Sequence, residues 1–336
     1  MEEAVGPGRT MQPMRLDDGG RQRGRRRLGT WLAGVVGLAG VAALILLINP
    51  SKLGSSLEHF DLLLIPAIIA CSVGYYTLQG VRWQFLLRDV GVRLSWGETI
   101  SINLAGQVTT LLPLGELTRV VLAARQARAP FSDVLATVTV QELIYGLLLV
   151  VVAVPGLFEF QVNPAIPVVA VVVAGLALAV LTVPSLFHVL HATGERILGV
   201  RRLLDPLDEL HAETVELLHR PDTLGWSFIS LAQVMAMSTA FWLVLSALAP
   251  GRLSWPEAAS VYAVASIGGA ISLIPGGLGA SEATFAGILI VAGLPPAPAT
   301  AVALMQRVAD QGVATAAGLV AYVYARHRYR LRRLFG

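Results

Sequence analysis

Residues 273–282 have the sequence Leu-Ile-Pro-Gly-Gly-Leu-Gly-Ala-Ser-Glu and break an apolar stretch that begins near residue 256. A similar break at 111–116, Leu-Leu-Pro-Leu-Gly-Glu, divides the stretch 97–128 into two arms. Proline lacks a backbone N–H and glycine relieves steric restrictions, so both let a chain reverse direction. Each arm of the first stretch has about 15 residues, or about 22 Å of helix, which is short for a membrane span. The sequence therefore predicts two re-entrant hairpins, 97–128 and 256–294. Their predicted tips contain Pro113, Gly115, Pro275, Gly276, Gly277 and Gly279.

The composition places these hairpins in a membrane protein. The chain of 336 residues is 55% hydrophobic and only 14% charged. Soluble domains carry about 25% charged residues, so this chain has too little charge to cover a water-exposed surface of its size. A membrane span needs roughly 20 apolar residues. Runs of about this length occur at 30–48, 62–87, 132–154, 165–190, 223–248 and 297–325. We therefore predict an all-α polytopic membrane protein with about six full spans in addition to the two re-entrant Pro-Gly hairpins.

Arginines gather at both ends of the chain, where they indicate which side of the membrane the ends occupy. The net charge is +3, but arginines are dense at 21–27 and again at 326–333. Basic residues that flank spans mark the cytoplasmic side and attract anionic lipid, and we favour this reading over nucleic-acid binding. We predict a disordered basic tail (1–28), one membrane domain (29–326) and a second basic tail (327–336). Both termini are predicted to be cytoplasmic, in a multi-pass protein of the plasma membrane.

The order of spans and breaks suggests an internal repeat. Counting crossings places the half-repeats 62–154 and 223–325 in opposite orientations, each with a hairpin between two spans. The segment 191–221 between them is predicted to be a cytoplasmic amphipathic helix on the membrane surface, with a solvated linker helix as the alternative. A loop through Pro155, Glu159 and Pro164 is predicted to be external. Paired Gly/Pro-interrupted segments in two inverted halves indicate the midplane binding site of a transporter.

Helix N-termini at the two breaks would point toward the protein centre and could bind an anion. The alternative is that the glycines only allow tight packing at the tips. Ionisable residues at membrane depth are the sharper signal, since each costs about 2.5–3.5 kcal/mol at a helix centre and so requires a role. The candidate substrate-binding or translocation residues are Glu116, Arg119, Glu142, Glu282, Arg307 and Asp310. The alternative for these residues is structural, as ion pairs of Glu282 with Arg307 or of Arg119 with Glu142.

The sequence contains no recognisable catalytic motif. It has no His-Glu-x-x-His, no Walker motif and no Ser-centred nucleophile elbow, so we expect no enzyme activity. The only cysteine, Cys71, leaves no thiol framework, and the histidines lack metal-ligand spacing. We therefore expect no metal and no cofactor.

Several blocks together resemble a known family. They are Arg82-Trp83-x-x-Leu86-Leu87, then Leu111-Leu112-Pro113-x-Gly115-Glu116-x-x-Arg119, then Ile274-Pro275-Gly276-Gly277-Leu278-Gly279-x-x-Glu282 and Arg307. Over roughly residues 30–325 this pattern resembles the lysylphosphatidylglycerol synthase transmembrane domain, or flippase-like, family. The resemblance implies movement of a phospholipid or another lipid-linked molecule between leaflets. The soluble aminoacyl-transfer domain of full-length synthases is not found, so we expect no synthase activity. After the first hairpin this chain has Gln141-Glu142…Tyr145 where the family has Glu-Arg…Asp.

The sequence thus predicts a flippase-like transporter whose partners are membrane lipids with anionic or zwitterionic headgroups, and no nucleic acid. Two alternatives stay open: a transporter of a soluble anion or proton-coupled solute, and an accessory membrane subunit for lipid or glycan modification. A homo-oligomer and a partner transferase are both compatible with the sequence.

Overall fold

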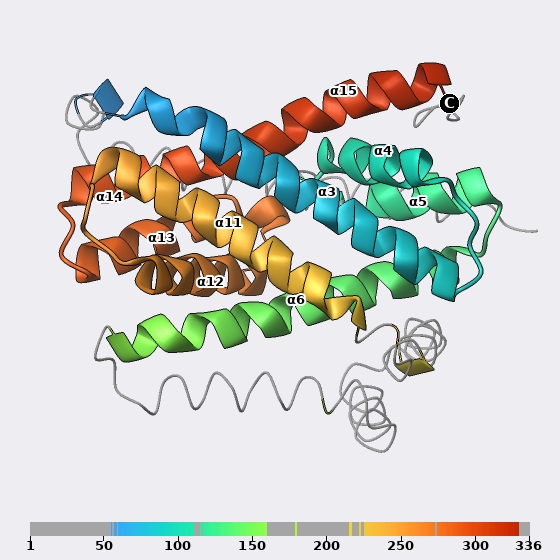
Figure 1. The fold of residues 1–336 in the computed structure, drawn as a ribbon, viewed down its shortest axis with the longest axis horizontal. Helices are drawn as coiled ribbons and strands as arrows, with labels where there is room; N and C mark the ends of the chain where they lie inside the picture. Colours follow the sequence, from blue (N-terminus) through green and yellow to red (C-terminus); the bar gives the residue numbers. More distant parts are fainter. Residues whose placement is uncertain are drawn as a thin grey trace, which may run out of the picture.

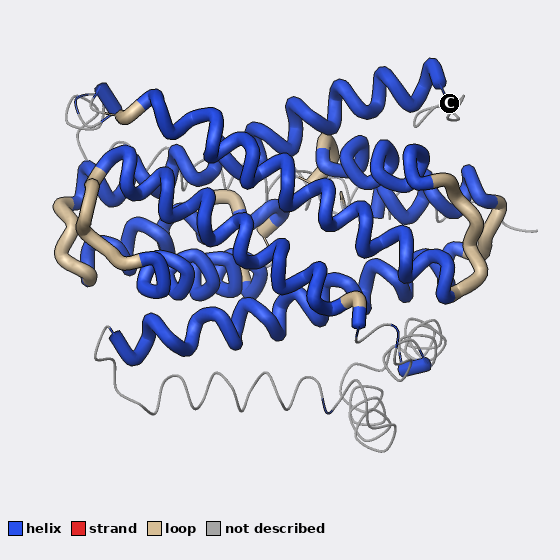
Figure 2. The backbone as a smooth tube through the Cα atoms, viewed as in Figure 1, coloured by secondary structure: helices blue, strands red, loops and turns tan. Residues whose placement is uncertain are grey.

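The computed structural model describes residues 55, 57–58, 60–110, 115, 117–159, 179, 215–216, 222, 225–272 and 274–328, without the side chains of 157–159, 275 and 326. All regular elements within these ranges are helices, and none is a strand (Figure 2). The predicted spans at 30–48 and 165–190, the tail 1–28 and nearly all of the segment 191–221 lie outside the described residues.

Three of the described helical segments are long and apolar enough to cross a membrane: Leu62–Asp89, Phe131–Gly156 and Ser227–Leu248. The α-helices are α3 (Ile65–Asp89), α4 (Trp96–Gln107), α5 (Leu117–Ala127), α6 (Phe131–Glu159), α11 (Ser227–Leu248), α12 (Trp255–Ile271), α13 (Ala280–Val291), α14 (Pro296–Arg307) and α15 (Val313–Arg328). Short turns of other helix types are η1 (Leu62–Leu64), η2 (Pro275–Gly277) and the π-helical turn η3 (Val308–Gly312).

The long helices α3, α6 and α11 run along the bundle, and two pairs of shorter helices fill it from opposite ends. The α4–α5 pair lies at the right-hand end and the α12–α13 pair at the left-hand end (Figure 1). Neighbouring contacts join α3 to α11, α6 to α12, α4 to α15 and α13 to α14. The inner ends of both short pairs point toward the middle of the bundle (Figure 1).

Both short pairs begin with the same local signal. Ser95 and Ser254 each accept a hydrogen bond from the backbone of the glutamate three residues later, and that glutamate bonds back to the serine N–H. These reciprocal bonds satisfy N–H groups that the first turn of a helix leaves unpaired. The surrounding sequences, Leu-Ser-Trp-Gly-Glu at 94–98 and Leu-Ser-Trp-Pro-Glu at 253–257, are nearly identical. Corresponding helices in the two halves thus start from the same chemistry.

The α4–α5 pair is antiparallel. At its outer end, the Gln126 side-chain amide donates to Glu98 at 2.9 Å. At its inner end Gly106 faces Arg119 so closely that a Cβ on the glycine would lie 2.8 Å from the Arg119 Cβ. A larger residue at position 106 would therefore separate α4 from α5.

Helix α6 continues past Pro155 to Glu159, which differs from the predicted loop. Proline removes one backbone donor and its ring displaces the preceding carbonyl, so this turn needs outside partners. The Ser260 hydroxyl of α12 supplies them, since it accepts from the Gly156 N–H at 3.0 Å and donates to the Ala153 carbonyl at 2.7 Å. A tertiary contact, invisible in the local sequence, thus preserves the helix.

The final predicted span, 297–325, is also not a single regular helix. Helix α14 ends at Arg307, the π-helical turn η3 follows, and α15 resumes at Val313. A π-helical turn is rare and occurs often at functional sites. This interruption carries Asp310 and Gln311, so it sets the direction of both side chains.

Replacing Gly156 with alanine should destabilise the α6–α12 contact. The new Cβ would lie 2.6 Å from the Pro256 carbonyl oxygen and against the Ser260 side chain. Overpacking of this kind costs about 1–3 kcal/mol. Thermal unfolding of the purified protein in detergent should show a lower Tm for Gly156→Ala. The control is Gly146→Ala in the same helix, where no atom lies within 4 Å of the added Cβ; equal Tm values for the two variants would contradict the packing argument.

Candidate functional site

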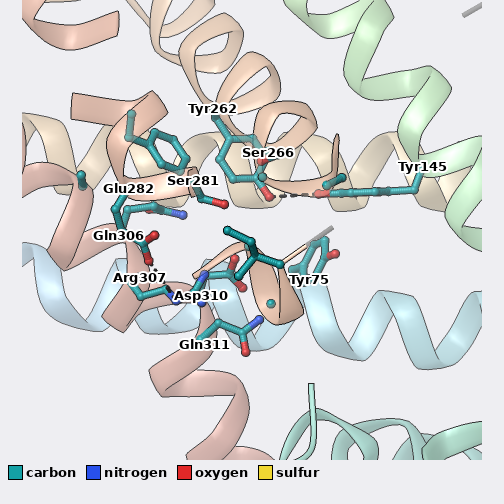
Figure 3. Close-up of a pocket in the computed structure, with 17 residues that line it drawn as sticks. Tyr75, Tyr145, Tyr262, Ser266, Ser281, Glu282, Gln306, Arg307, Asp310 and Gln311 are labelled. Carbon is teal, nitrogen blue, oxygen red and sulfur yellow. Dashed lines mark hydrogen bonds and ion pairs between the residues drawn. The ribbon is translucent and has the colours of Figure 1, made fainter. Parts of the chain in front are cut away.

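A polar cavity of about 370 Å³ lies beside the tip of the α12–α13 pair. Its walls come from α3, α6, α12, α13, α14 and the π-helical turn, so both halves of the described bundle contribute (Figure 3). The polar residues that line it are Tyr75, Tyr145, Tyr262, Ser266, Ser281, Glu282, Gln306, Arg307, Asp310 and Gln311. A polar cavity inside an apolar helix bundle is a candidate binding site.

Glycines at the tip bring the chain into the cavity wall. Gly277 has φ 62° and a Cβ there would lie 3.3 Å from the Gly269 Cα, so both the backbone conformation and the close approach require glycine. Gly276 and Gly279 also have positive φ values, 61° and 82°. These angles turn the chain from α12 into α13 within a few residues and place Ser281 and Glu282 at the cavity.

Glu282 is only 1% exposed and has two partners. One carboxylate oxygen accepts from the Gly279 N–H at 2.7 Å, and the other lies 3.2 Å from the Arg307 Nε. The first bond places a negative charge at the N-terminus of α13. The anion site predicted at this helix end is therefore occupied by the protein's own carboxylate, and the Glu282–Arg307 ion pair joins α13 to α14.

Three cavity residues present polar atoms that have no hydrogen-bond partner among the described residues. They are Oε1 of Glu282, which has only the ion-pair contact with Arg307, Nη2 of Arg307, and both side-chain amide atoms of Gln306, which is 2% exposed. Buried polar atoms are almost always paired, by protein, water or ligand. These atoms therefore indicate where a polar group of a bound molecule would be recognised.

The π-helical turn connects this site to the first half of the chain. The Tyr76 hydroxyl of α3 donates to Asp310. The Thr110 hydroxyl, just after α4, donates to Gln311 at 2.9 Å. Across the cavity, the Tyr145 and Tyr262 hydroxyls lie 2.9 Å apart and link α6 to α12 (Figure 3). Any change in the relative position of the two halves would have to alter these bonds.

Of the other predicted charged residues, Arg119 and Glu142 do not line this cavity. Arg119, 1% exposed, forms an ion pair with Glu142 at 2.6 Å and donates to Asn103 and Gln141 at 3.0 and 3.3 Å. It also lies over the Trp83 ring, 5.6 Å from its centre. These contacts form a second polar network among α3, α4, α5 and α6. Both ion pairs expected as the structural alternative are thus present, one in the cavity wall and one outside it.

Glu116 and Pro113 lie outside the described residues. Gly115 is the residue of the first predicted tip that the structure describes. Its carbonyl accepts a hydrogen bond from the Thr109 hydroxyl at 3.0 Å. Glu142 has 45% of its side chain exposed, on the same face of α6 as the cavity residue Tyr145 one turn on. Sequence reasoning missed Tyr75, Tyr262 and Gln306. The sequence did contain a signal for them, because each places a hydroxyl or amide inside a predicted membrane segment: Tyr75 and Gln306 in spans, and Tyr262 in the second hairpin.

We expect Arg119 to be needed for stability. In Arg119→Ala, the buried Asn103 and Gln141 oxygens lose a donor, which should cost about 1–3 kcal/mol, and the partly exposed Glu142 loses its cation at a smaller cost. The matched control is Arg88→Ala, since Arg88 is exposed and packs over the Trp96 ring at 4.9 Å. Thermal unfolding in detergent should show a much larger fall in Tm for Arg119→Ala. A stable Arg119→Ala protein would instead point to a role in substrate handling.

The sequence was compared with known proteins. The model of the lysylphosphatidylglycerol synthase TM region matches residues 31–318. A protein described as a UPF0104 membrane protein, from Methanothermobacter thermautotrophicus, is 23% identical over 307 residues, which cover 83% of this chain and 89% of that protein. The family match extends over both short helix pairs and all the residues that line the cavity. The resemblance predicted from the Pro-Gly blocks is therefore confirmed: this chain is a membrane protein that belongs to the lysylphosphatidylglycerol synthase TM region family.

Proposed function

We propose that this protein is a flippase-like transporter that moves a phospholipid or lipid-linked molecule between membrane leaflets. The observation that carries the proposal is a polar cavity among apolar helices, in which Arg307 and Gln306 have atoms without a hydrogen-bond partner among the described residues. A lipid headgroup needs polar solvation as it crosses the bilayer, whereas its acyl chains can remain in hydrocarbon. The cavity supplies polar groups for the headgroup and does not need to enclose the acyl chains.

The proposed transport geometry is an inverted repeat with two re-entrant hairpins, α4–α5 and α12–α13. Four features support it. The helices of both pairs are shorter than the long helices α3, α6 and α11, and the two pairs enter the bundle from opposite ends (Figure 1). The two helices of a pair run antiparallel, and the first helix of each pair begins with the same Ser-x-x-Glu cap. The two arms of the first pair have 12 and 11 residues, or about 18 and 16 Å of helix. Their inner ends converge on the π-helical turn, which places the site near the middle of the bundle. Both termini are proposed to face the cytoplasm.

The charges in the cavity favour a lipid headgroup over a free soluble anion. The described cavity wall contains two carboxylates, Glu282 and Asp310, and one guanidinium, Arg307. A site for a free anion would need an excess of positive charge. A headgroup that also carries hydroxyl or amine groups can use Arg307 for its phosphate and the remaining polar groups for the rest. We propose no catalytic step, and a partner transferase would act outside this cavity.

Leaflet exchange tests the proposal. Purified protein would be reconstituted in liposomes with fluorescent phospholipids bearing anionic or zwitterionic headgroups, at equal pH inside and outside. Wild type should exchange at least one of these lipids. Glu282→Gln and Arg307→Ala each remove a charge-assisted contact worth about 1.5–3 kcal/mol, so exchange should slow about tenfold or more. Arg252→Ala, in the exposed turn between α11 and α12, is the control and should behave like wild type.

A second variant separates binding from folding. Gln306→Leu keeps the side-chain volume and removes amide atoms that have no partner within the described ranges, so stability should be unchanged or higher. Exchange should nevertheless fall, because a headgroup would lose these contacts. Wild-type exchange by folded Gln306→Leu and Arg307→Ala proteins would refute this cavity as the path. No exchange of any headgroup by folded wild-type protein would refute lipid translocation.

A further inference from the structure

Asp310 has a position that the proposed headgroup contacts do not explain. It lies on the π-helical turn η3, which packs against α3, α11, α14 and α15, and it faces the central cavity (Figure 3). Its hydrogen-bond partner is the Tyr76 hydroxyl of α3. Asp310 therefore connects the helix that starts the first half-repeat to the helix that ends the second.

The charges around Asp310 do not balance. The titratable groups that face it are Tyr75 and Tyr76 from α3, Tyr145 from α6, Tyr262 from α12, Glu282 from α13 and Arg307 from α14. Helix α11 carries no titratable residue, and those of α15 begin at Tyr322, far along that helix. The positive charge of Arg307 is already paired with Glu282 at 3.2 Å. Among the described residues around Asp310, Arg307 is thus the one cation near two carboxylates, Glu282 and Asp310.

Asp310 is partly buried and lines the cavity. A carboxylate without a cation of its own is costly in a low-dielectric environment, even when it accepts a hydrogen bond from a neutral hydroxyl, and uptake of one positive charge would remove that cost. The Tyr76 hydroxyl can donate to one Asp310 oxygen whether or not the other oxygen carries a proton. A proton on Asp310 would make the empty cavity neutral and leave the bond to α3 in place.

We propose that Asp310 is a proton-exchange site that couples proton movement to the lipid movement proposed above. A hydronium ion on one side of the membrane gives up a proton: its O–H bond breaks as an O–H bond forms with the Asp310 oxygen that does not accept from Tyr76, leaving water. On the other side the Asp310 O–H bond breaks as the proton binds a water molecule, which leaves the carboxylate and a hydronium ion. Coupling arises because a change in the relative position of the two halves alters the Tyr76–Asp310 bond and the surroundings of the carboxyl group.

The proton can be detected on the protein itself. Infrared spectra of the purified protein at neutral pH should contain the carbonyl band of a protonated carboxylic acid. The band should be lost in Asp310→Asn, should shift in Tyr76→Phe, and should persist in Asp222→Asn, a variant of an exposed carboxylate. A wild-type spectrum without this band, or a band that Asp310→Asn leaves unchanged, would overturn the assignment. This measurement does not depend on which lipid is moved.

Coupling is tested by the end point of lipid exchange under a pH gradient. One proton per lipid can change the ratio of fluorescent lipid between leaflets by up to about tenfold per pH unit. Wild-type liposomes should reach an uneven distribution, whereas Asp310→Asn liposomes, if they exchange at all, should reach an even one. The Asp222→Asn control should follow wild type.

The two proposals fail in different ways. Exchange that reaches the same even distribution with and without the gradient would overturn coupling and leave lipid translocation standing. Absence of exchange by folded wild-type protein would overturn translocation and, with it, coupling. The infrared band would then still decide whether Asp310 holds a proton.

Discussion

The constraint on which this structure depends is that polar groups inside an apolar bundle must find partners in the protein. The Gln79 side chain shows how this works, because its oxygen accepts from both Asn103 and Gln107 at 3.1 Å. Arg119 and Gln141 extend the same network to α5 and α6. No water is available at membrane depth to replace a lost partner, so these bonds fix the relative positions of α3, α4, α5 and α6.

The π-helical turn adds polar bonds between the second half of the chain and this network. Asp310 and Gln311 accept from Tyr76 and Thr110, while Arg307 pairs with Glu282 on the neighbouring side. A regular α-helix would turn Asp310 and Gln311 by a different angle. These polar bonds supplement the packed contacts of α3 with α11, α6 with α12 and α4 with α15. A change in the relative position of the two halves would therefore have to break these bonds while the packed helices shift.

The cavity wall contains buried polar atoms that have no hydrogen-bond partner within the described residues, as do a few side chains away from it, such as Arg82 and Gln233. Elsewhere the buried arginine Arg119 has several partners, yet Gln306 has no hydrogen bond within the described part of the chain. The glycines at the tip help to keep the cavity open. They allow the backbone to approach α12 closely and add no side chain that would fill the space. Unpaired groups that line an open cavity, as those of Gln306 and Arg307 do, can be reached by a ligand that supplies the missing contacts.

The sequence by itself determined the membrane class, the family, the two breaks and the charged residues at depth, because apolar runs and Pro-Gly blocks are local properties. It also contained the matched caps at Ser95 and Ser254, which mark the two halves. Only the tertiary structure decided which charges share a site: Glu282, Arg307 and Asp310 line the cavity, whereas Arg119 and Glu142 do not. It also decided that α6 continues past Pro155 and that a π-helical turn interrupts the last helix. These outcomes depend on partners supplied by distant segments, such as Ser260 and Tyr76, and no local pattern specifies such partners.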